Sequence, residues 1–231
     1  MRPIHAVAAL ALLAVTACTQ QTEATYDLSL YPACTDVEDV SAAAEGCVLT
    51  QEPMLHALLV EVIEGTVNVQ VVADGAAGQL IQEAAQGPAF TPTLTDLNGD
   101  SQPDLLIPLS TGNVNTTWAV HASGQDASYT RLGEFSGVGW GPSATGLLAV
   151  PARSNAATWE VNFYDVEPGG LTLIATVETA LETAGATPRC RLVGTPVLGA
   201  QTMEEALTQY CSDPAVAGIW TDSAPDEAEA Q

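Results

Sequence analysis

The chain has 231 residues, of which 47% are hydrophobic, 28 are acidic and only five are basic, so its formal net charge is −23. Such a surface repels nucleic-acid phosphates and anionic lipid headgroups, which argues against both as partners. It attracts basic proteins and divalent cations. The alternative is that the acidic residues only keep the protein soluble. The hydrophobic fraction is ample for a core, so most of the chain is expected to fold.

The N-terminus has the pattern of a secretory signal. Arg2 precedes an apolar run at 6–15, which is too short to span a membrane, and small residues come directly before Cys18. The segment resembles the lipobox of bacterial lipoproteins. This resemblance implies removal of residues 1–17, acylation of Cys18 with palmitate-type chains, and permanent anchoring. Because Thr19 is not Asp, the family's sorting rule implies the outer membrane, facing the periplasm of a Gram-negative bacterium. The alternative is an ordinary cleaved signal that leaves Cys18 free.

Four further cysteines allow three disulfide pairings. An oxidising compartment favours disulfides over metal thiolates, and proximity in the sequence favours Cys34–Cys47 and Cys190–Cys211. Along the chain we expect a lipidated tether at 18–30, a single β domain at 31–221 whose first part, 31–53, is rich in loops, and an acidic disordered tail at 222–231.

Short apolar and β-branched runs predict an all-β fold. The runs at 58–63 and 67–72, separated by Glu64-Gly65-Thr66, indicate a hairpin, and Asp74-Gly75 forms a turn before a third strand at 79–82. Further strands are expected at 105–109, 118–121, 129–132, 146–150, 159–164 and 171–174. Strands that alternate with turns in this way favour antiparallel meanders, as in a sandwich, barrel or propeller. Near the C-terminus, Thr202 is a candidate N-cap for a short helix that ends at about Tyr210.

One internal motif carries metal chemistry. Counted from Asp96, side-chain oxygens occupy positions 1, 3, 5 and 9, and a backbone carbonyl occupies position 7; these ligands are Asp96, Asn98, Asp100, Asp104 and the carbonyl of Gln102. Alternating oxygen donors in a tight loop suit Ca²⁺, whereas an Asx-rich turn held by its own hydrogen bonds is the alternative. The motif resembles the calcium loops of FG-GAP and VCBS β-propeller repeats. One departure is Ser101, at a position where the family usually has Gly to make the sharp turn of the loop. We expect Gly99, two residues earlier, to provide this backbone freedom instead.

A wider resemblance covers about 67–180, in the order hairpin, calcium loop, and strands containing Trp118, Tyr129 and Trp159. It is to calcium-binding periplasmic lipoproteins that include lysozyme inhibitors and immunity proteins. The resemblance implies a small irregular β-propeller or barrel with one calcium loop. It also implies a protein-binding module that inhibits a peptidoglycan-cleaving enzyme.

Such inhibitors resemble one another in a Ser-Gly loop followed by an aromatic residue. Two segments match, and they give the candidate partner-binding residues Tyr129, preceded by Ser123-Gly124, and Ser136, Gly137 and Trp140. The negative charge would steer the chain to a basic partner, and an exposed aromatic residue would serve as an anchor. The alternative for both segments is an ordinary turn, with Trp140 capping the core.

The sequence contains no recognisable catalytic motif. His56 begins one apolar strand and His121 lies in another, so both are expected to be strand residues at a sheet face. No G-x-S-x-G, H-E-x-x-H or phosphate-binding loop occurs. We therefore expect a non-enzymatic binding protein with Ca²⁺ as its cofactor. The alternatives are a structural or assembly lipoprotein of the outer membrane and a cryptic hydrolase with paired acids.

Overall fold

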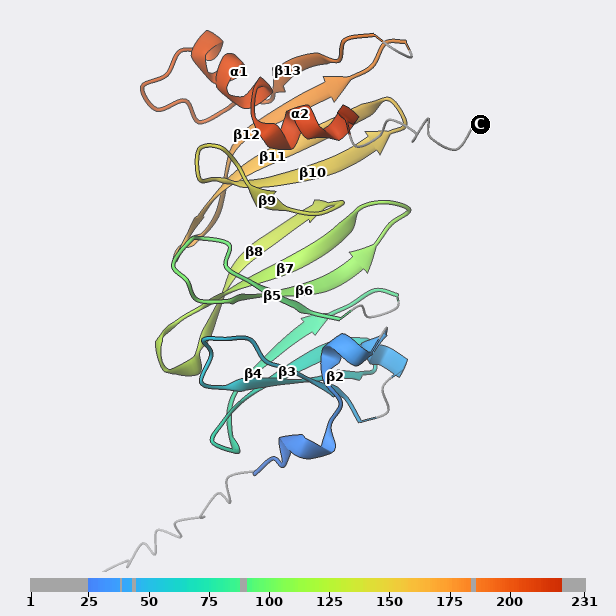
Figure 1. Ribbon diagram of the computed structural model, residues 1–231, viewed down its shortest axis with the longest axis vertical. Helices are drawn as coiled ribbons and strands as arrows, with labels where there is room; N and C mark the ends of the chain where they lie inside the picture. Colours follow the sequence, from blue (N-terminus) through green and yellow to red (C-terminus); the bar gives the residue numbers. More distant parts are fainter. Residues whose placement is uncertain (1–24, 38, 43–44, 88–90, 184–185, 222–231) are drawn as a thin grey trace, which may run out of the picture.

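Three antiparallel sheets follow one another along the chain and lie one above another in space (Figure 1). This is a computed structural model, and it describes residues 25–37, 39–42, 45–87, 91–183 and 186–221. The first sheet has the order β1 (Cys47–Leu49), β2 (Ala57–Ile63), β3 (Thr66–Ala73) and β4 (Ala76–Ala84). The second has the order β5 (Thr93–Thr95), β6 (Asp104–Thr111), β7 (Thr116–Ser123) and β8 (Tyr129–Gly137). The third runs in the reverse order from β13 (Arg189–Val193) through β12 (Gly170–Ala180), β11 (Thr158–Glu167) and β10 (Leu148–Asn155) to β9 (Gly141–Pro142).

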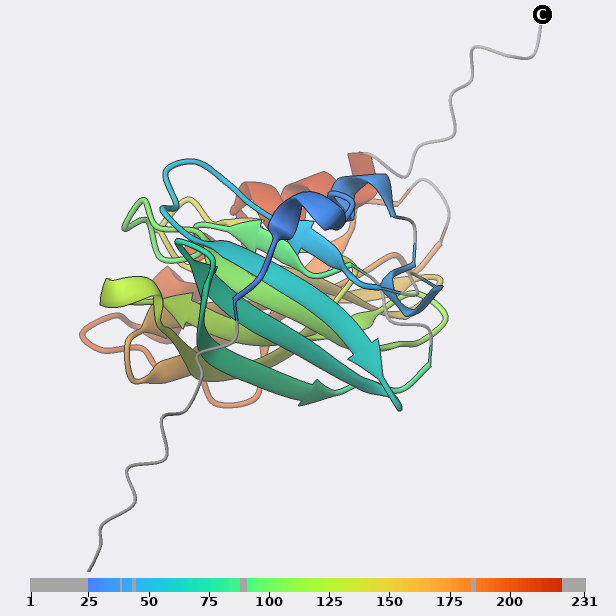
Figure 2. The ribbon, with the colours of Figure 1, turned by 90° about the horizontal axis from the view of Figure 1, so that it is seen from below.

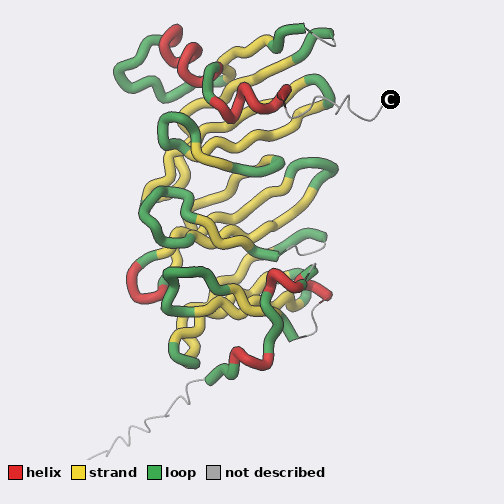
Figure 3. The backbone as a smooth tube through the Cα atoms, viewed as in Figure 1, coloured by secondary structure: helices red, strands yellow, loops and turns green. Residues whose placement is uncertain are grey.

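The remaining regular elements lie at the two ends of the stack and in one turn. Figure 3 shows helices α1 (Met203–Cys211) and α2 (Pro214–Thr221) at one end, and short helical turns at the other. The 3₁₀ turns are η1 (Leu28–Leu30), η2 (Cys34–Asp36), η3 (Val40–Ala42) and η4 (Gln125–Ala127), of which η4 joins β7 to β8. No helix within the described part of the chain is long and apolar enough to cross a bilayer.

The predicted all-β fold of antiparallel meanders with a short C-terminal helix is confirmed. Each sheet is an up-and-down meander, and no sheet of the described residues closes into a barrel. Seen from below, the first sheet presents its strands obliquely across the end of the stack (Figure 2). Two-residue turns connect β2 to β3 and β3 to β4, with positive φ at Glu64-Gly65 and at Asp74-Gly75, which is the geometry of a type I′ hairpin.

The middle sheet is buried on both faces. Along β6, Leu105 and Ile107 face the first sheet and join its cluster of valines, whereas Leu106 faces the third sheet. Because successive side chains of a strand point to opposite faces, a strand that is covered on both sides must be apolar at every position. This explains why residues 105–107 form an unbroken apolar run.

The two C-terminal helices cover the outer face of the third sheet. Tyr210 of α1 packs against Phe163 of β11, with ring centroids 4.8 Å apart. Thr202 caps α1 through a capping box with Glu205, as its sequence predicts. Helix α2 was not predicted. It begins after Asp213, whose buried carboxylate accepts the N–H of Ala215 and also the N–H of Ala144, which lies far away in the sequence.

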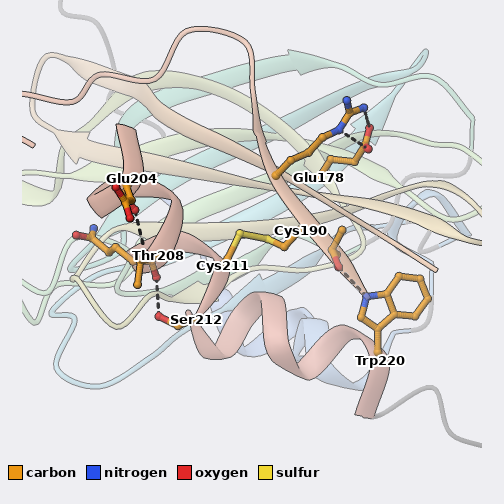
Figure 4. The surroundings of a disulfide bond; sticks show 10 residues. Glu178, Cys190, Glu204, Thr208, Cys211, Ser212 and Trp220 are labelled. Carbon is orange, nitrogen blue, oxygen red and sulfur yellow. Dashed lines mark hydrogen bonds and ion pairs between the residues drawn. A yellow bond between two sulfur atoms is a disulfide. The ribbon is translucent and has the colours of Figure 1, made fainter. Parts of the chain in front are cut away.

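Both disulfides expected from sequence proximity are present. Cys34–Cys47 joins η2 to β1, and Cys190–Cys211 joins β13 to α1. Figure 4 shows the second disulfide between the helix and the sheet, with the indole N–H of Trp220 donating to Thr179 Oγ1 nearby (2.8 Å). The segment 31–53 is less irregular than expected, because it also contains η2, η3 and β1.

The signal at 1–17, the acylation site Cys18 and the acidic tail at 222–231 lie outside the described residues. The predicted tether at 18–30 is described only from residue 25 onward. There Thr25 bridges Ala76, and the N–H of Tyr26 donates to the carbonyl of Gly75 (2.8 Å). The chain therefore enters the fold against the first sheet.

Candidate functional site

The predicted calcium loop connects β5 to β6 in the middle sheet. These strands pair at Thr95 and Asp104, so the loop is closed at its base by the sheet. The carboxylate of Asp96 accepts the N–H groups of Gly99 (2.7 Å) and Ser101 (2.9 Å), which winds the backbone around this side chain. Asn98 Oδ1 accepts the N–H of Asp100 (2.9 Å), and Asp100 Oδ1 in turn accepts that of Gln102 (2.7 Å). The oxygens at alternate positions thus organise the loop from inside.

Ser101 adopts the left-handed conformation that the family resemblance assigns to Gly. Its φ is +66°, and Gly99 is also left-handed with φ +77°. For a residue with a Cβ this conformation costs roughly 1–2 kcal/mol. Gly99 therefore does not replace Ser101 in making the sharp turn, since both residues take part in it.

Asp104 ties the loop to the neighbouring strand. It is fully buried, Oδ2 accepts the N–H of Leu97 (3.0 Å), and Oδ1 accepts the N–H of Ser123 at the end of β7 (2.9 Å). Burial raises the pKa of the Asp104 carboxyl, the two backbone hydrogen bonds lower it, and the charges of Asp100 and Asp96 raise it. A nearby cation would offset this unfavourable concentration of negative charge.

The donor set of the loop fits a hard cation in type. The five predicted ligands are all oxygens on one short segment, and each carboxylate oxygen has a second lone pair beside the one that accepts an N–H. Across the described residues, no three or more His, Cys, Asp or Glu side chains are gathered as a metal-binding group. Calcium binding therefore stays a prediction, and it depends on Asn98 and the Gln102 carbonyl as well as on the acids.

A groove of about 880 Å³ adjoins the loop between the first and second sheets. One wall is the segment from Pro53 to His56, which precedes β2, and another is the β7–β8 turn from Ser123 to Ala127. Asp100 and Gln102 of the loop and Asp74 of the β3–β4 turn complete the lining. Sequence reasoning missed this groove because its walls come from four separate segments.

Tyr129, a predicted partner-binding residue, lies between the first two sheets. It is only 4% exposed, and its hydroxyl lies 3.0 Å from Nε2 of His56. The side chain of Gln79 on β4 donates to the Tyr129 carbonyl (2.9 Å) and accepts its N–H (2.7 Å), which clamps the two sheets together. Burial, and then the charge of Asp104, raises the pKa of the Tyr129 hydroxyl, and burial lowers the pKa of His56. The ring of Tyr129 is therefore almost entirely buried and offers a partner very little surface.

The segment with Ser136, Gly137 and Trp140 links the second sheet to the third. Ser136 is exposed, whereas Gly137 is buried where β8 approaches β10. A Cβ at Gly137 would lie 2.5 Å from the Pro151 carbonyl oxygen, so a side chain has no room there. The half-buried Trp140 stands edge-on to Trp118, with ring centroids 4.8 Å apart, and tilts against Phe135.

Trp140 also lies beside the predicted calcium loop. A second hollow of about 430 Å³ is lined by residues 95–99 of the loop and by Trp140 and its neighbours. The loop therefore has the acidic groove on one side and the tryptophan on the other. The candidate calcium loop and the segment with Trp140, which are separate motifs in the sequence, are therefore neighbours in the fold.

A polar network that is buried at His121 and reaches the surface at Arg131 was also missed. Nε2 of His121 on β7 lies 2.8 Å from Oε1 of Glu83 on β4, and Nε of Arg131 donates to the same oxygen (2.7 Å). Arg131 also pairs with Glu134. Burial lowers the pKa of His121, the hydrogen bond and charge of Glu83 oppose this, and Arg131 adds to it. His121 thus lies on a sheet face, as predicted, and bridges two sheets.

Comparison with known proteins gives little further information. No protein family matches the chain, and no curated protein matches it. Among solved structures, a chain described as a Xanthomonas type IV secretion system related protein superposes with a TM-score of 0.43 at 12% sequence identity. The superposition covers 67% of this chain and 92% of the other. This loose likeness assigns neither a family nor a function.

Proposed function

We propose that the chain is an acidic envelope lipoprotein that binds another protein and is stabilised by calcium. In this proposal Cys18 carries the lipid, and the β domain faces the periplasm from the outer membrane. Two disulfides support an oxidising compartment, because they are uncommon in reducing ones. The loop from Asp96 to Asp104 would hold Ca²⁺ through the oxygens that already shape it.

The observation that carries the binding function is the uncompensated negative charge. Of the four described arginines, Arg131, Arg189 and Arg191 are each paired with a glutamate, and Arg153 lies over the ring of Trp159. The remaining acids therefore produce a field that no basic patch within the described residues balances. A field of this sign accelerates association with basic proteins and raises the salt dependence of the rate.

The partner that we propose is a basic peptidoglycan-cleaving enzyme, which the chain would inhibit without turning over a substrate of its own. The test is the cleavage of peptidoglycan by a basic lysozyme, with the purified, processed chain added at increasing ratios. Inhibition that saturates near one to one, and an association rate that falls steeply with salt, are expected. A chain that co-purifies with an outer-membrane complex but leaves cleavage unchanged would favour the structural alternative. Turnover of peptidoglycan by the chain itself would favour a hydrolase.

A further inference from the structure

The groove between the first two sheets has a chemical character of its own. Three exposed carboxylates line it, and they belong to Asp74, Asp100 and Asp126. None of them forms an ion pair within the described part of the chain, and no lysine or arginine lines the groove. One histidine, His56, is part of the lining, and burial lowers its pKa, which favours the neutral imidazole. A cation that enters the groove would therefore meet no competing charge.

An apolar lip accompanies these acids. The side chain of Leu55 is 95% exposed and lines the groove, and the half-buried Met54 and Ala127 lie along it. The hydroxyl of Ser123, another lining residue, is buried and has no hydrogen-bond partner among the described residues. The groove thus combines apolar contact area, carboxylates on separate walls and one unused polar group.

We propose that this groove binds an arginine side chain that projects from a basic protein segment, with Leu55 packing against an apolar neighbour of that arginine. The inference rests on the proposed protein-binding function and names the chemistry of the partner. Arginine has an apolar stem and five N–H donors in a planar fork, which matches acceptors that approach from several directions. A metal ion is a poorer match, because the lining acids come from three different segments and form no metal-binding group among the described residues.

Two acids are suited to a clean test. Asp74 and Asp126 both have left-handed backbones, with φ values of 51° and 59°. Asn tolerates this conformation well, so Asp74→Asn with Asp126→Asn removes two charges and keeps the turns. The matched control is Glu64→Gln with Glu167→Gln, because Glu64 in the β2–β3 turn and Glu167 at the end of β11 are both exposed and carry the same charge outside the lining of the groove.

The probe is a fluorescein-labelled hexapeptide, Gly-Ser-Arg-Leu-Ser-Gly, whose binding to the purified, processed chain is followed by anisotropy in physiological salt. We expect the groove variant to weaken binding at least about tenfold, or about 1.4 kcal/mol, and the control to change it less than about twofold. Replacing the arginine with the neutral isostere citrulline should weaken binding as much as the groove variant does.

Equal loss in the groove variant and its control would overturn the proposal, because the binding would then reflect overall charge. Undiminished binding of the citrulline peptide, or no binding of the arginine peptide at millimolar concentration, would also overturn it. The lysozyme assay distinguishes a failure of the proposed groove from a failure of the proposed inhibitory function. Inhibition that survives in the groove variant keeps the proposed function and removes the groove as the contact. Groove-dependent peptide binding without inhibition by the unmodified chain keeps the groove and removes the inhibitory function.

Discussion

Calcium is expected to stabilise the fold, and the structure indicates how to isolate its effect. A ligand that binds only the folded state adds RT ln(1 + [L]/Kd) to the free energy of unfolding. Extracellular calcium modules have Kd values of ~10⁻⁴–10⁻³ M, so ~5 mM calcium would add roughly 1–2 kcal/mol. For a domain of this size that corresponds to a rise in Tm of roughly 2–8 °C.

The decisive variant is Asp100→Asn. An Asn at this position still accepts the N–H of Gln102 through Oδ1, so the loop loses one of its three carboxylates and, besides the charge, only the exposed hydrogen bond from Asn98 Nδ2 to Oδ2 (3.1 Å). Melting in EDTA should therefore be nearly unchanged, whereas the rise with calcium should be largely lost. Glu167→Gln, which removes one exposed charge at the end of β11 and outside the loop, should keep the full rise. The fluorescence of Trp140, beside the loop, gives a second measurement. Equal melts in calcium and EDTA for the unmodified chain would refute calcium binding.

Three further predictions concern the scaffold. Cys190→Ala with Cys211→Ala should lower the free energy of unfolding by about 3 kcal/mol in urea melts, because the disulfide closes a loop with a separation of 21 residues; an unchanged midpoint would contradict this. Burial depresses the pKa of His121 below its unfolded value of 6.5, so the unfolded chain takes up protons first as the pH falls. Stability should therefore be full above pH 6.5 and should decrease below it. His121→Gln, which can still donate to Glu83, should have a shallower dependence of Tm on pH. Gly137→Ala should cost about 1–3 kcal/mol, because the new Cβ would lie 2.6 Å from Val150 Cγ1, whereas Gly139→Ala meets nothing within 4 Å and serves as the control.

The strands that the sequence predicted are those with a visible pattern. Residues 67–71 alternate between a valine that faces the core and a polar side chain, and 105–107 is apolar throughout because both faces are covered. The strands that escaped prediction include β1, β5 and β9, which have two or three residues each. A period of two cannot be recognised over so few residues, and such strands are defined by the longer strands that they pair with.

The features of the candidate site also differ in whether a local sequence pattern reveals them. The candidate calcium loop is recognisable in the sequence because all its oxygens lie within nine consecutive residues and their spacing is the signal; calcium binding itself stays a prediction. The groove brings together four separate segments between Pro53 and Ala127, and the Glu83–His121 contact joins residues 38 positions apart, so only the stacking of the sheets creates them. For Trp140, the sequence indicates the glycine-rich segment that contains it, but it does not indicate that its ring packs on Trp118.

Asp100 connects the two proposed binding events, because it belongs to the calcium loop and also lines the groove. A calcium ion on the loop would neutralise part of the charge that attracts a guanidinium, while it would hold in place the wall from which that charge projects. The first effect weakens the binding of arginine and the second strengthens it. With Asp74 and Asp126 outside the loop, two of the three carboxylates keep their charge, so the electrostatic loss is partial. Linkage requires that whatever factor calcium imposes on the affinity for the arginine segment, that segment imposes on the affinity for calcium.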